Sequence, residues 1–277
     1  MPTCNVCHHR CNIAEGSFGL CHARTCKDGR IFCANYGHVT SIALDPIEKK
    51  PLSRFFPGSN IVSVGSYGCN LRCPFCQNYS ISYGFADEGV GYDVTTPQQL
   101  VNIALEYKNP KYKNIGIAFT YNEPLVGFEF VRDTARLSHE NGLKNVLVSN
   151  GNVTGEVCDE ILPFIDAMNI DLKGFTDKYY SEVLKGDRKM VMDFIEKSSK
   201  SCHMEVTTLI VPGYNDTPEE ISDLAAWLSE LGDITLHITR YFPRFRMTDV
   251  PATDVELIYL LADTARQKLK YVYTGNC

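Results

Sequence analysis

The chain has 277 residues, of which 44% are hydrophobic, so it can bury one large core and does not require two domains. Its formal net charge of −6 provides no broad basic field, which disfavours a nucleic acid as a partner. The N-terminal segment lacks the basic and apolar regions of a secretory signal, and no later stretch has the long uncharged apolar run of a membrane span. We therefore expect a cytoplasmic protein without a membrane partner.

Twelve cysteines are present, and in a chain without an export signal a reducing environment favours metal or cluster binding over disulfides. Six of them lie in the first 33 residues and three lie between residues 69 and 76. The other three, Cys158, Cys202 and Cys277, are scattered, and we interpret them as small buried hydrophobic residues or chance thiols.

Residues 1–60 are rich in cysteine, glycine and turns, and we expect a small cysteine-rich metal-binding module followed by a connecting segment. A complete set of four thiolates, in the spacing C-x2-C-x3-C-x9-C, is formed by Cys4, Cys7, Cys11 and Cys21. Zinc and a [4Fe-4S] cluster both satisfy this ligand count, and the spacing does not choose between them. A cluster could relay electrons, whereas zinc would be structural or would dock a partner. Substitute ligands are available in Cys26, Cys33, His8, His9 and His22.

Residues 61–277 alternate between short β-branched runs and longer amphipathic stretches, which predicts strand–helix units around a parallel sheet. Strands are predicted at Ile61–Tyr67, Asn114–Thr120, Asn145–Ser149, Ala167–Asp171, Met204–Val211 and Ile234–Thr239. Helices are predicted at Pro97–Tyr107, Val126–Asn141, Gly155–Ile165, Lys189–Ser199, Pro218–Leu231 and Asp254–Lys268. Thr96 before Pro97 and Thr217 before Pro218 are good helix start signals.

Polar residues, glycine and proline follow the predicted strands at their C-terminal ends, the rim where barrel enzymes build their sites. In chain order these segments are Gly68–Cys73, Thr120–Pro124, Ser149–Gly151, Asp171–Lys173, Val211–Gly213 and His237–Arg246. Six such units predict an α/β fold, a partial (β/α)6 TIM-like barrel that is open on one side, with the small cysteine-rich module at its N-terminus.

Cys69-Asn-Leu-Arg-Cys73-Pro-Phe-Cys76 follows the first predicted strand and is the most informative motif. A [4Fe-4S] cluster normally takes four thiolates, one on each iron, so three cysteines in eight residues leave one iron open. An open iron can chelate the amino and carboxylate groups of S-adenosylmethionine (SAM), whose sulfonium can then be reduced to release a 5′-deoxyadenosyl radical. Zinc is the competing interpretation, although a structural zinc site uses a closed set of four ligands.

The motif resembles CxxxCxxC, the signature of the radical SAM superfamily on the loop after the first barrel strand. The resemblance is closer to the pyruvate formate-lyase activating enzymes, and closest to the radical enzyme of the AmmeMemoRadiSam system. Besides the cysteine loop, the segments that carry it are Asp45–Leu52, Tyr67–Leu71, Phe75–Asn78, Phe119–Pro124, Asn169–Lys173 and Tyr271–Asn276. It spans nearly the whole chain and implies a [4Fe-4S] cluster on Cys69, Cys73 and Cys76 with SAM as cofactor.

The resemblance also implies a first set of cofactor-binding residues. Asn122 and Glu123 lie where the superfamily clamps the methionine amino group, with Glu123 as the acceptor, although Glu123 could instead cap the following helix. Ser149 and Asn150 would face the ribose and the methionine carboxylate, although Asn-Gly is also a common turn pair.

Three further positions complete the expected cofactor site. Lys173 could pair with the cofactor carboxylate and Asp171 could hold a monovalent cation or a ribose hydroxyl, unless the two side chains simply neutralise each other. Val211 would contribute to a wall against adenine, unless its segment is only a turn.

His237 is counted with the cofactor-binding residues and belongs to a run of cations and aromatics. This run, which includes Arg240, Tyr241, Arg244 and Arg246, could bind an anionic substrate or a partner protein, unless its arginines are simply solvated.

The preferred hypothesis is a radical SAM oxidoreductase that forms a 5′-deoxyadenosyl radical for hydrogen abstraction from an unknown substrate. It would need a reductant such as flavodoxin or ferredoxin. One alternative is an activase for a glycyl-radical enzyme, which needs a protein substrate. An alternative of another class is an iron–sulfur electron-transfer or scaffold protein without turnover, for which an amino-acid clamp would have no use.

Overall fold

The computed structural model describes residues 1–84 and 89–277, and its main element is a sheet of eight strands in the order β12-β11-β10-β9-β8-β7-β5-β4. Adjacent strands are parallel except β4, which pairs antiparallel with β5. The strands are β4 (Ser41–Pro46), β5 (Asn60–Gly65), β7 (Asn114–Phe119), β8 (Lys144–Ser149), β9 (Ala167–Asp171), β10 (His203–Ile210), β11 (Thr235–Arg240) and β12 (Tyr271–Gly275). The partial TIM-like barrel is confirmed, while β4 and β12 were not predicted.

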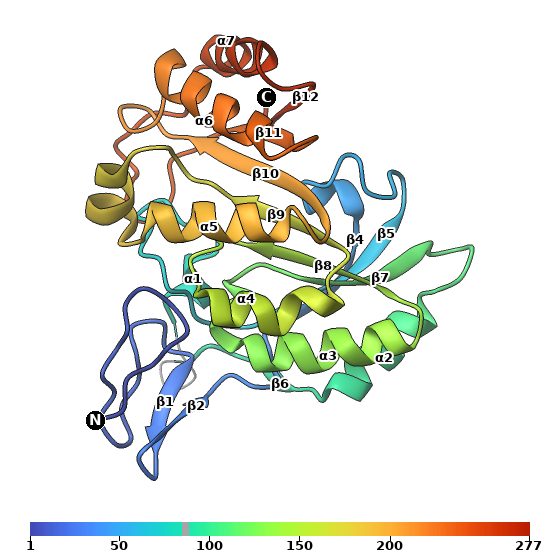
Figure 1. The fold of residues 1–277 in the computed structure, drawn as a ribbon. Helices are drawn as coiled ribbons and strands as arrows, with labels where there is room; N and C mark the ends of the chain where they lie inside the picture. The colour runs from blue at the N-terminus through green and yellow to red at the C-terminus, as the bar shows by residue number, and fades with distance from the viewer. Residues whose placement is uncertain (85–88) are drawn as a thin grey trace.

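In the described part of the chain, a four-residue helix, α1 (Tyr79–Ser82), follows β5, and six longer α-helices connect the parallel strands; α3, α4 and α5 lie in a row along one face of the sheet (Figure 1). They are α2 (Pro97–Glu106), α3 (Phe128–Glu140), α4 (Gly155–Ile161), α5 (Arg188–Ser198), α6 (Pro218–Glu230) and α7 (Val255–Arg266). The predicted start signals are used, because the Thr96 and Thr217 side chains accept hydrogen bonds from backbone N–H groups of the first turns of α2 and α6. α4 ends before Pro163, and a 3₁₀ turn (Leu162–Phe164) replaces the predicted last turn.

Two further short helices border the rim. A 3₁₀ helix, η3 (Pro124–Gly127), precedes α3, and a π-helix, η5 (Tyr179–Leu184), follows β9. Neither was predicted as a separate element, since four to six residues are too few to show a helical period.

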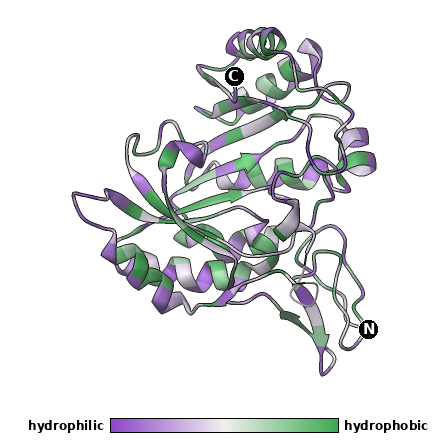
Figure 2. Cartoon of the chain, turned by 180° about the vertical axis from the view of Figure 1, so that it is seen from behind, coloured by the Kyte–Doolittle hydropathy of each residue, from purple (hydrophilic) through white to green (hydrophobic). Residues whose placement is uncertain are grey.

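Figure 2 shows both hydrophobic and hydrophilic residues along the strands and the helices. The central strands are nonetheless buried, and the polar residues that they bury include Asn169 and Glu205. Val62, Ile117 and Met168 point outward to the helices and belong to the large core. Ile61 and Ala167 belong to a separate buried cluster with Ile47 and Leu52. The segment before β5 therefore packs into the interior of the barrel.

Glu205, in the amino-terminal half of β10, fixes that segment from inside the barrel. Its side chain is 0% exposed and accepts hydrogen bonds from the backbone N–H groups of Ser53 and Arg54 at 3.0 and 2.8 Å. It also contacts His203 at 2.9 Å and His237 at 2.6 Å. The four partners compensate the cost of burying this carboxylate. Hydrogen bonds to a charged group, as well as hydrophobic packing, therefore stabilise the base of the barrel.

Acid should weaken this arrangement. Burial by itself raises the pKa of Glu205, but the hydrogen bonds from His203, His237, Arg54 and Ser53 lower it to about 2, below its ordinary value of 4.5. A lowered pKa contributes stability above the unfolded-state value that is lost as the pH falls through the folded-state value. Because this contribution is lost, we expect the free energy of unfolding to fall by about 3 kcal/mol between pH 4.5 and pH 2. Urea unfolding at each pH measures the change.

The matched control for this prediction is Glu48, a surface carboxylate on the same segment that accepts from the Gly58 N–H. The Glu205→Gln variant should show a flatter dependence on acid pH than the wild type, and Glu48→Gln should retain the full slope. Equal slopes for Glu205→Gln and the wild type would contradict the prediction.

The N-terminal module lies beside the ends of the barrel strands where they finish (Figure 1). It contains a hairpin of β1 (Arg24–Lys27) and β2 (Arg30–Cys33), and it continues to β3 (His38–Val39), which pairs with β6 (Asp93–Val94). Arg24, which is buried, forms a two-pronged ion pair with Glu129 of α3. β4 precedes the predicted domain boundary at residue 61 and yet belongs to the barrel sheet.

Candidate active site

The cysteine loop follows β5 and carries three thiols with different exposure: Cys73 is buried, and Cys69 and Cys76 are partly exposed. The loop is held by its own backbone, because Cys76 N–H donates to the Cys73 carbonyl at 3.2 Å and the Arg72 guanidinium donates to the Cys69 carbonyl at 2.8 Å. Gly68 has φ +90°, and a Cβ at this position would lie 2.4 Å from the Cys21 carbonyl oxygen. The turn into the loop therefore requires glycine.

The three thiols suit a [4Fe-4S] cluster better than a single ion. The loop supplies three thiols, whereas a structural zinc site uses a closed set of four ligands. A zinc ion needs its sulfurs about 2.3 Å from one point, whereas each thiolate of a [4Fe-4S] cluster binds a separate iron, so the sulfurs stay farther apart. Burial raises the pKa of Cys73 to about 11 and that of Cys69 well above its ordinary value, so both are thiols at neutral pH unless a bound metal stabilises their thiolates.

Glu123 lies at the end of β7 and is 2% exposed. One carboxylate oxygen accepts from Ser149 Oγ at 2.7 Å and from Leu125 N–H at 3.0 Å, and the other accepts from Asn150 N–H at 2.8 Å. Burial raises its pKa to about 7 even though these hydrogen bonds oppose the shift. Glu123 caps η3, as the structural alternative predicted, and it also joins two of the predicted site residues.

The Asn122 side chain forms hydrogen bonds with the backbone at the start of the cysteine loop. Its amide oxygen accepts from Ser66 N–H at 3.0 Å, and its amide nitrogen donates to the carbonyls of Tyr67 and Gly68, both at 3.0 Å. The side chain therefore links the segment after β7 to the start of the cysteine loop. We interpret Asn122 as a residue that positions this loop.

Asn150 connects the Glu123 network to the cysteines. Its amide nitrogen donates to Asn70 Oδ1 at 2.9 Å and lies 3.7 Å from Cys69 Sγ. Asn70 in turn donates to the Asn152 carbonyl at 2.7 Å, and both of these asparagines are fully buried. Asn70 and Asn152 were missed at the sequence level, although each adjoins a predicted motif.

Asp171 and Lys173 form an ion pair at 2.8 Å at the end of β9, as the alternative of mutual neutralisation predicted. Burial by itself lowers the pKa of Lys173, but Asp171 and the neighbouring Cys73 raise it well above its ordinary value, so the ammonium remains charged. The pair is partly exposed, with 35% of the Asp171 side chain accessible. It brings a cation next to the cysteine loop while leaving the carboxylate open to solvent.

Two predicted residues lie elsewhere than expected. The Val211 side chain is fully buried by the protein, so the accessible residues of its segment are Pro212 and Gly213. His237 was expected at the rim but is the third residue of β11 and points to Glu205 inside the barrel. The orientation of His237 follows from the pleat of β11, because alternate residues of a strand face opposite sides of the sheet, whereas Val211 lies just past the end of β10.

The loop after β11 reaches across to the cysteine loop. Arg246 N–H donates to the Pro74 carbonyl at 2.9 Å, and the Phe245 ring stacks on Tyr79 with 4.5 Å between centroids. Tyr83 donates to the Cys73 carbonyl at 3.0 Å. Part of the predicted cationic and aromatic run therefore borders the site, whereas Arg240 is bound to the Thr253 carbonyl.

Tyr121 is a residue of the site that was missed at the sequence level. It has φ +74°, an unfavourable value for a non-glycine residue. Its hydroxyl donates to Asp45 of β4 at 2.7 Å, and the same carboxylate oxygen accepts from the buried Lys50 at 2.8 Å. The Lys50 ammonium also lies 4.7 Å from the centre of the Tyr121 ring. The edge strand thus holds the backbone that presents Asn122 and Glu123.

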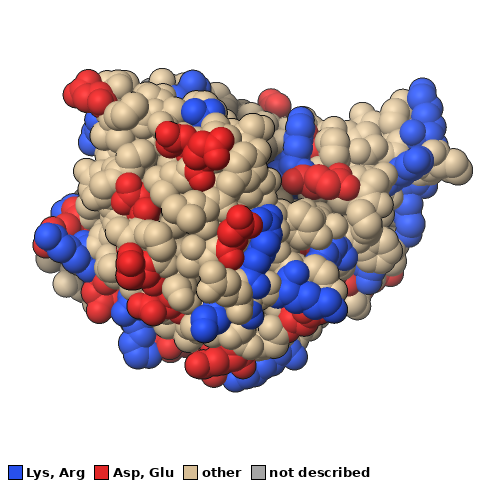
Figure 3. Space-filling model, turned by 90° about the horizontal axis from the view of Figure 1, so that it is seen from above, with Lys and Arg blue, Asp and Glu red and all other residues tan. Residues whose placement is uncertain are grey.

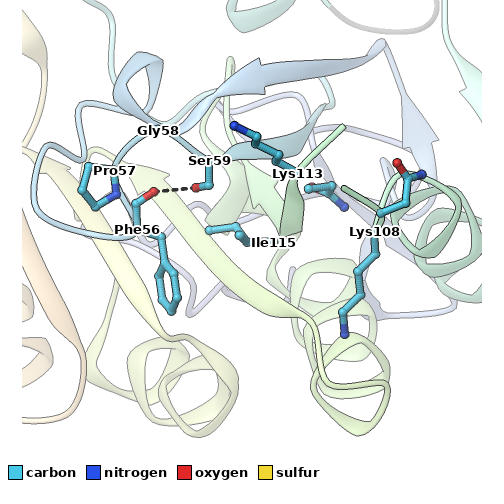
Figure 4. A pocket seen from close by; sticks show the side chains of 9 residues that line it. Phe56, Pro57, Gly58, Ser59, Lys108, Lys113 and Ile115 are labelled. Atoms are coloured by element: carbon cyan, nitrogen blue, oxygen red, sulfur yellow. Dashed lines mark hydrogen bonds between the residues drawn. The ribbon is translucent and has the colours of Figure 1, made fainter. Parts of the chain in front are cut away.

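An open cavity near the opposite ends of β5 and β7 carries no comparable chemistry. It is lined by residues 56–59, 108–109 and 113–115, and Figure 4 shows that Lys108 and Lys113 do not converge on one point. Lys108 donates to the Gly142 carbonyl at 2.9 Å. The cavity lies at the N-terminal ends of the strands. In barrel enzymes this face serves stability, and the active site lies at the opposite face.

The surface offers no broad charged field on the face seen in Figure 3, where acidic and basic side chains are interspersed. None of the helices in the described parts of the chain combines the length and hydrophobicity needed to cross a lipid bilayer.

Comparisons with known proteins identify the family. Residues 63–228 match the Radical SAM superfamily. An uncharacterized protein of Methanocaldococcus jannaschii (MJ0808) is 40% identical over 277 residues, covering 99% of this chain and 80% of that protein. The pyruvate formate-lyase 1-activating enzyme of Escherichia coli is 24% identical over 170 residues, covering 60% of this chain and 68% of that enzyme.

The fold agrees as well. The structure of a radical SAM methyltransferase from Sphaerobacter thermophilus superimposes with a TM-score of 0.61 at 16% identity, covering 79% of this chain and 67% of that chain. A barrel of this topology, a three-cysteine loop after β5 and a match over more than half of the sequence lead to one assignment: the chain belongs to the radical SAM superfamily.

Proposed function

We propose that this chain is an enzyme that binds a [4Fe-4S] cluster on Cys69, Cys73 and Cys76 and reductively cleaves SAM. The observation that carries the proposal is the chain of contacts from Cys69 through Asn150 to Glu123, which joins the cysteine loop to a buried carboxylate. A carboxylate beside three iron-binding thiols suits the ammonium of an amino acid, and an electron carrier has no need for it.

Glu123 is the acceptor for the methionine ammonium in this proposal. Its two oxygens accept three hydrogen bonds from the protein, and an ionised carboxylate has about four acceptor positions, so one remains for the ligand. Ser149 and Asn150 fix the carboxylate in place, and their polar groups border the ribose and the methionine carboxylate. The ammonium would favour the ionised form of Glu123 against the effect of burial.

Lys173 and Asp171 supply the remaining polar contacts to SAM. Lys173 supplies positive charge for the methionine carboxylate next to Cys73, and Asp171 offers its exposed oxygens to a ribose hydroxyl or a monovalent cation. Pro212 and Gly213, in place of the buried Val211, form the wall for adenine. When bound, the cluster supplies one electron to the sulfonium, and cleavage of the carbon–sulfur bond gives methionine and a 5′-deoxyadenosyl radical for hydrogen abstraction.

A second candidate function is activation of a glycyl-radical enzyme, in which the hydrogen is taken from a glycine of a protein substrate. It is favoured by the similarity to relatives that are named activating enzymes, including the 24% identity with the Escherichia coli enzyme. In both functions the chain works with a one-electron reductant such as flavodoxin or ferredoxin.

The test is SAM cleavage by protein reconstituted anaerobically with iron and sulfide and then reduced with dithionite. We expect equal amounts of methionine and 5′-deoxyadenosine, and a change in the electron paramagnetic resonance spectrum of the reduced cluster when SAM is added. Cluster signals that SAM leaves unchanged, without 5′-deoxyadenosine, would identify an electron-transfer or scaffold protein instead. A glycyl-radical signal with a co-expressed partner protein would select the activase.

A further inference from the structure

The four N-terminal cysteines that the spacing singled out surround one enclosed cavity. Cys4, Cys7, Cys11 and Cys21 all line it, together with apolar side chains such as Ile13 and Val126. The Cys4 N–H donates to the Cys11 carbonyl at 2.8 Å, which brings the backbones of the first and third cysteines together. The module therefore folds around its sulfur atoms.

The substitute ligands are engaged elsewhere. Cys26 Sγ lies 3.5 Å from a Glu15 carboxylate oxygen, and Cys33 Sγ lies 3.2 Å from Asn35 Oδ1. His9 borders the cavity, but its Nε2 is 2.8 Å from the Asn70 carbonyl. His8 and His22 do not line the cavity, so the candidate ligand set is the four thiols of Cys4, Cys7, Cys11 and Cys21.

The position of these thiols favours a cluster over zinc. They line one cavity beside the cysteine loop of the barrel, where a group that carries electrons has a use, and zinc has no redox chemistry. Four thiolates satisfy a complete [4Fe-4S] cluster, which leaves no iron open for SAM.

The cavity adjoins the cysteine loop of the barrel. The carbonyl of Cys21 abuts Gly68, the residue before Cys69. The carbonyl of Leu20 accepts from Arg72, and His9 contacts Asn70, so residues on both sides of Cys69 touch the module. The backbones that carry Cys21 and Cys69 are thus in van der Waals contact, and no other element separates the two sulfur sets.

We propose that Cys4, Cys7, Cys11 and Cys21 hold a second [4Fe-4S] cluster that receives single electrons and passes them to the cysteine loop of the barrel. The role of this second cluster as a relay rests on the proposed SAM cleavage. The identity of the metal group in the N-terminal site does not. Each electron comes from a reduced flavodoxin- or ferredoxin-type carrier and is consumed when one carbon–sulfur bond of SAM breaks. Leu20 lines the cavity and is 39% exposed, so such a carrier can approach within one side chain of the cluster.

The identity of the metal is tested without any activity. A variant with Cys69, Cys73 and Cys76 all replaced by alanine keeps only the N-terminal site. We expect it to bind about four irons and four sulfides and to show the resonance of a reduced cluster. One zinc and no iron would overturn the proposal. If this variant does not fold, the wild type decides: about eight irons support two clusters, and about four irons with one zinc overturn the proposal.

The relay is tested with Cys7→Ala, which removes one N-terminal ligand, and with Cys158→Ala as the control for loss of a buried thiol outside both sites. With reduced flavodoxin, 5′-deoxyadenosine formation by Cys7→Ala should fall at least about tenfold, while formation with dithionite stays within about twofold of the wild type. Equal rates with flavodoxin, or loss with both reductants while the loop cluster is intact, would overturn the relay. A wild type inactive with both reductants would refute the SAM cleavage but not the second cluster.

Discussion

Replacing Cys73 with alanine is expected to abolish both the cluster of the barrel and SAM cleavage. Cys73 is the middle thiol of the loop, is buried, and lies beside Lys173. Two remaining thiolates cannot hold three irons of a cubane, so the cluster should be lost rather than weakened. The measurements are iron content, which should fall by about four irons per chain, visible absorbance, which should fall with it, and 5′-deoxyadenosine formation, which should fall to background.

Cys202→Ala is the matched control, because Cys202 is a partly buried thiol whose Sγ contacts the Ser198 carbonyl at 3.5 Å, far along the chain from either cysteine set. It should retain cluster and activity. Residual cleavage by Cys73→Ala above that of a protein-free reaction would refute the assignment of the ligands.

Replacing Glu123 with glutamine should have the second-largest effect, on the affinity for SAM. Loss of a charge-assisted hydrogen bond to the ammonium costs about 1.5–3 kcal/mol, which corresponds to roughly 10- to 100-fold weaker binding. Glutamine keeps the size of the side chain and one acceptor for Ser149 and Leu125. The measurement is the Kd of SAM, by equilibrium dialysis with the reconstituted protein.

The pH dependence gives a sharper test of the same residue. Burial raises the pKa of Glu123 to about 7, so the carboxylate becomes protonated as the pH falls below this value. We expect the wild-type Kd for SAM to rise about tenfold per pH unit in this range, and the Glu123→Gln variant to lack this dependence. Glu220 is the control, a carboxylate that accepts from Phe175 N–H at 2.5 Å and whose pKa is also raised by burial. A Glu220→Gln variant with the same loss of SAM affinity would contradict the role of Glu123.

Much of the barrel could be predicted because each strand is a short apolar run that ends in polar residues, and each helix has local start signals. β9 was predicted with the observed bounds, and the cysteine loop lies where the first strand ends. The edge strand β4 was not predicted, since its sequence Ser41–Pro46 alternates weakly and ends in proline. Its place follows only from pairing with β5, which is a tertiary property.

The chemistry at the rim was partly predictable for a related reason. Glu123, Ser149 and Asn150 are adjacent to strand ends, and parallel strands bring their ends together. The position of His237 could not be predicted, because it depends on Glu205, 32 residues away along the chain, and on the segment that both help to hold. A contact between residues so far apart along the chain leaves no pattern in the local sequence.

The pairing of Tyr121 with Asp45 has a consequence for shortened forms of the protein. A fragment that starts at β5 would retain all three cysteines of the loop and Glu123, yet it would lack both Asp45 and Lys50. The left-handed backbone at Tyr121 would keep the hydrogen bond that Asn78 Nδ2 donates to its carbonyl at 2.6 Å, but its hydroxyl would lose the partner on the edge strand. A barrel trimmed in this way would keep its three thiols, and we expect it to hold the segment that carries Glu123 less rigidly.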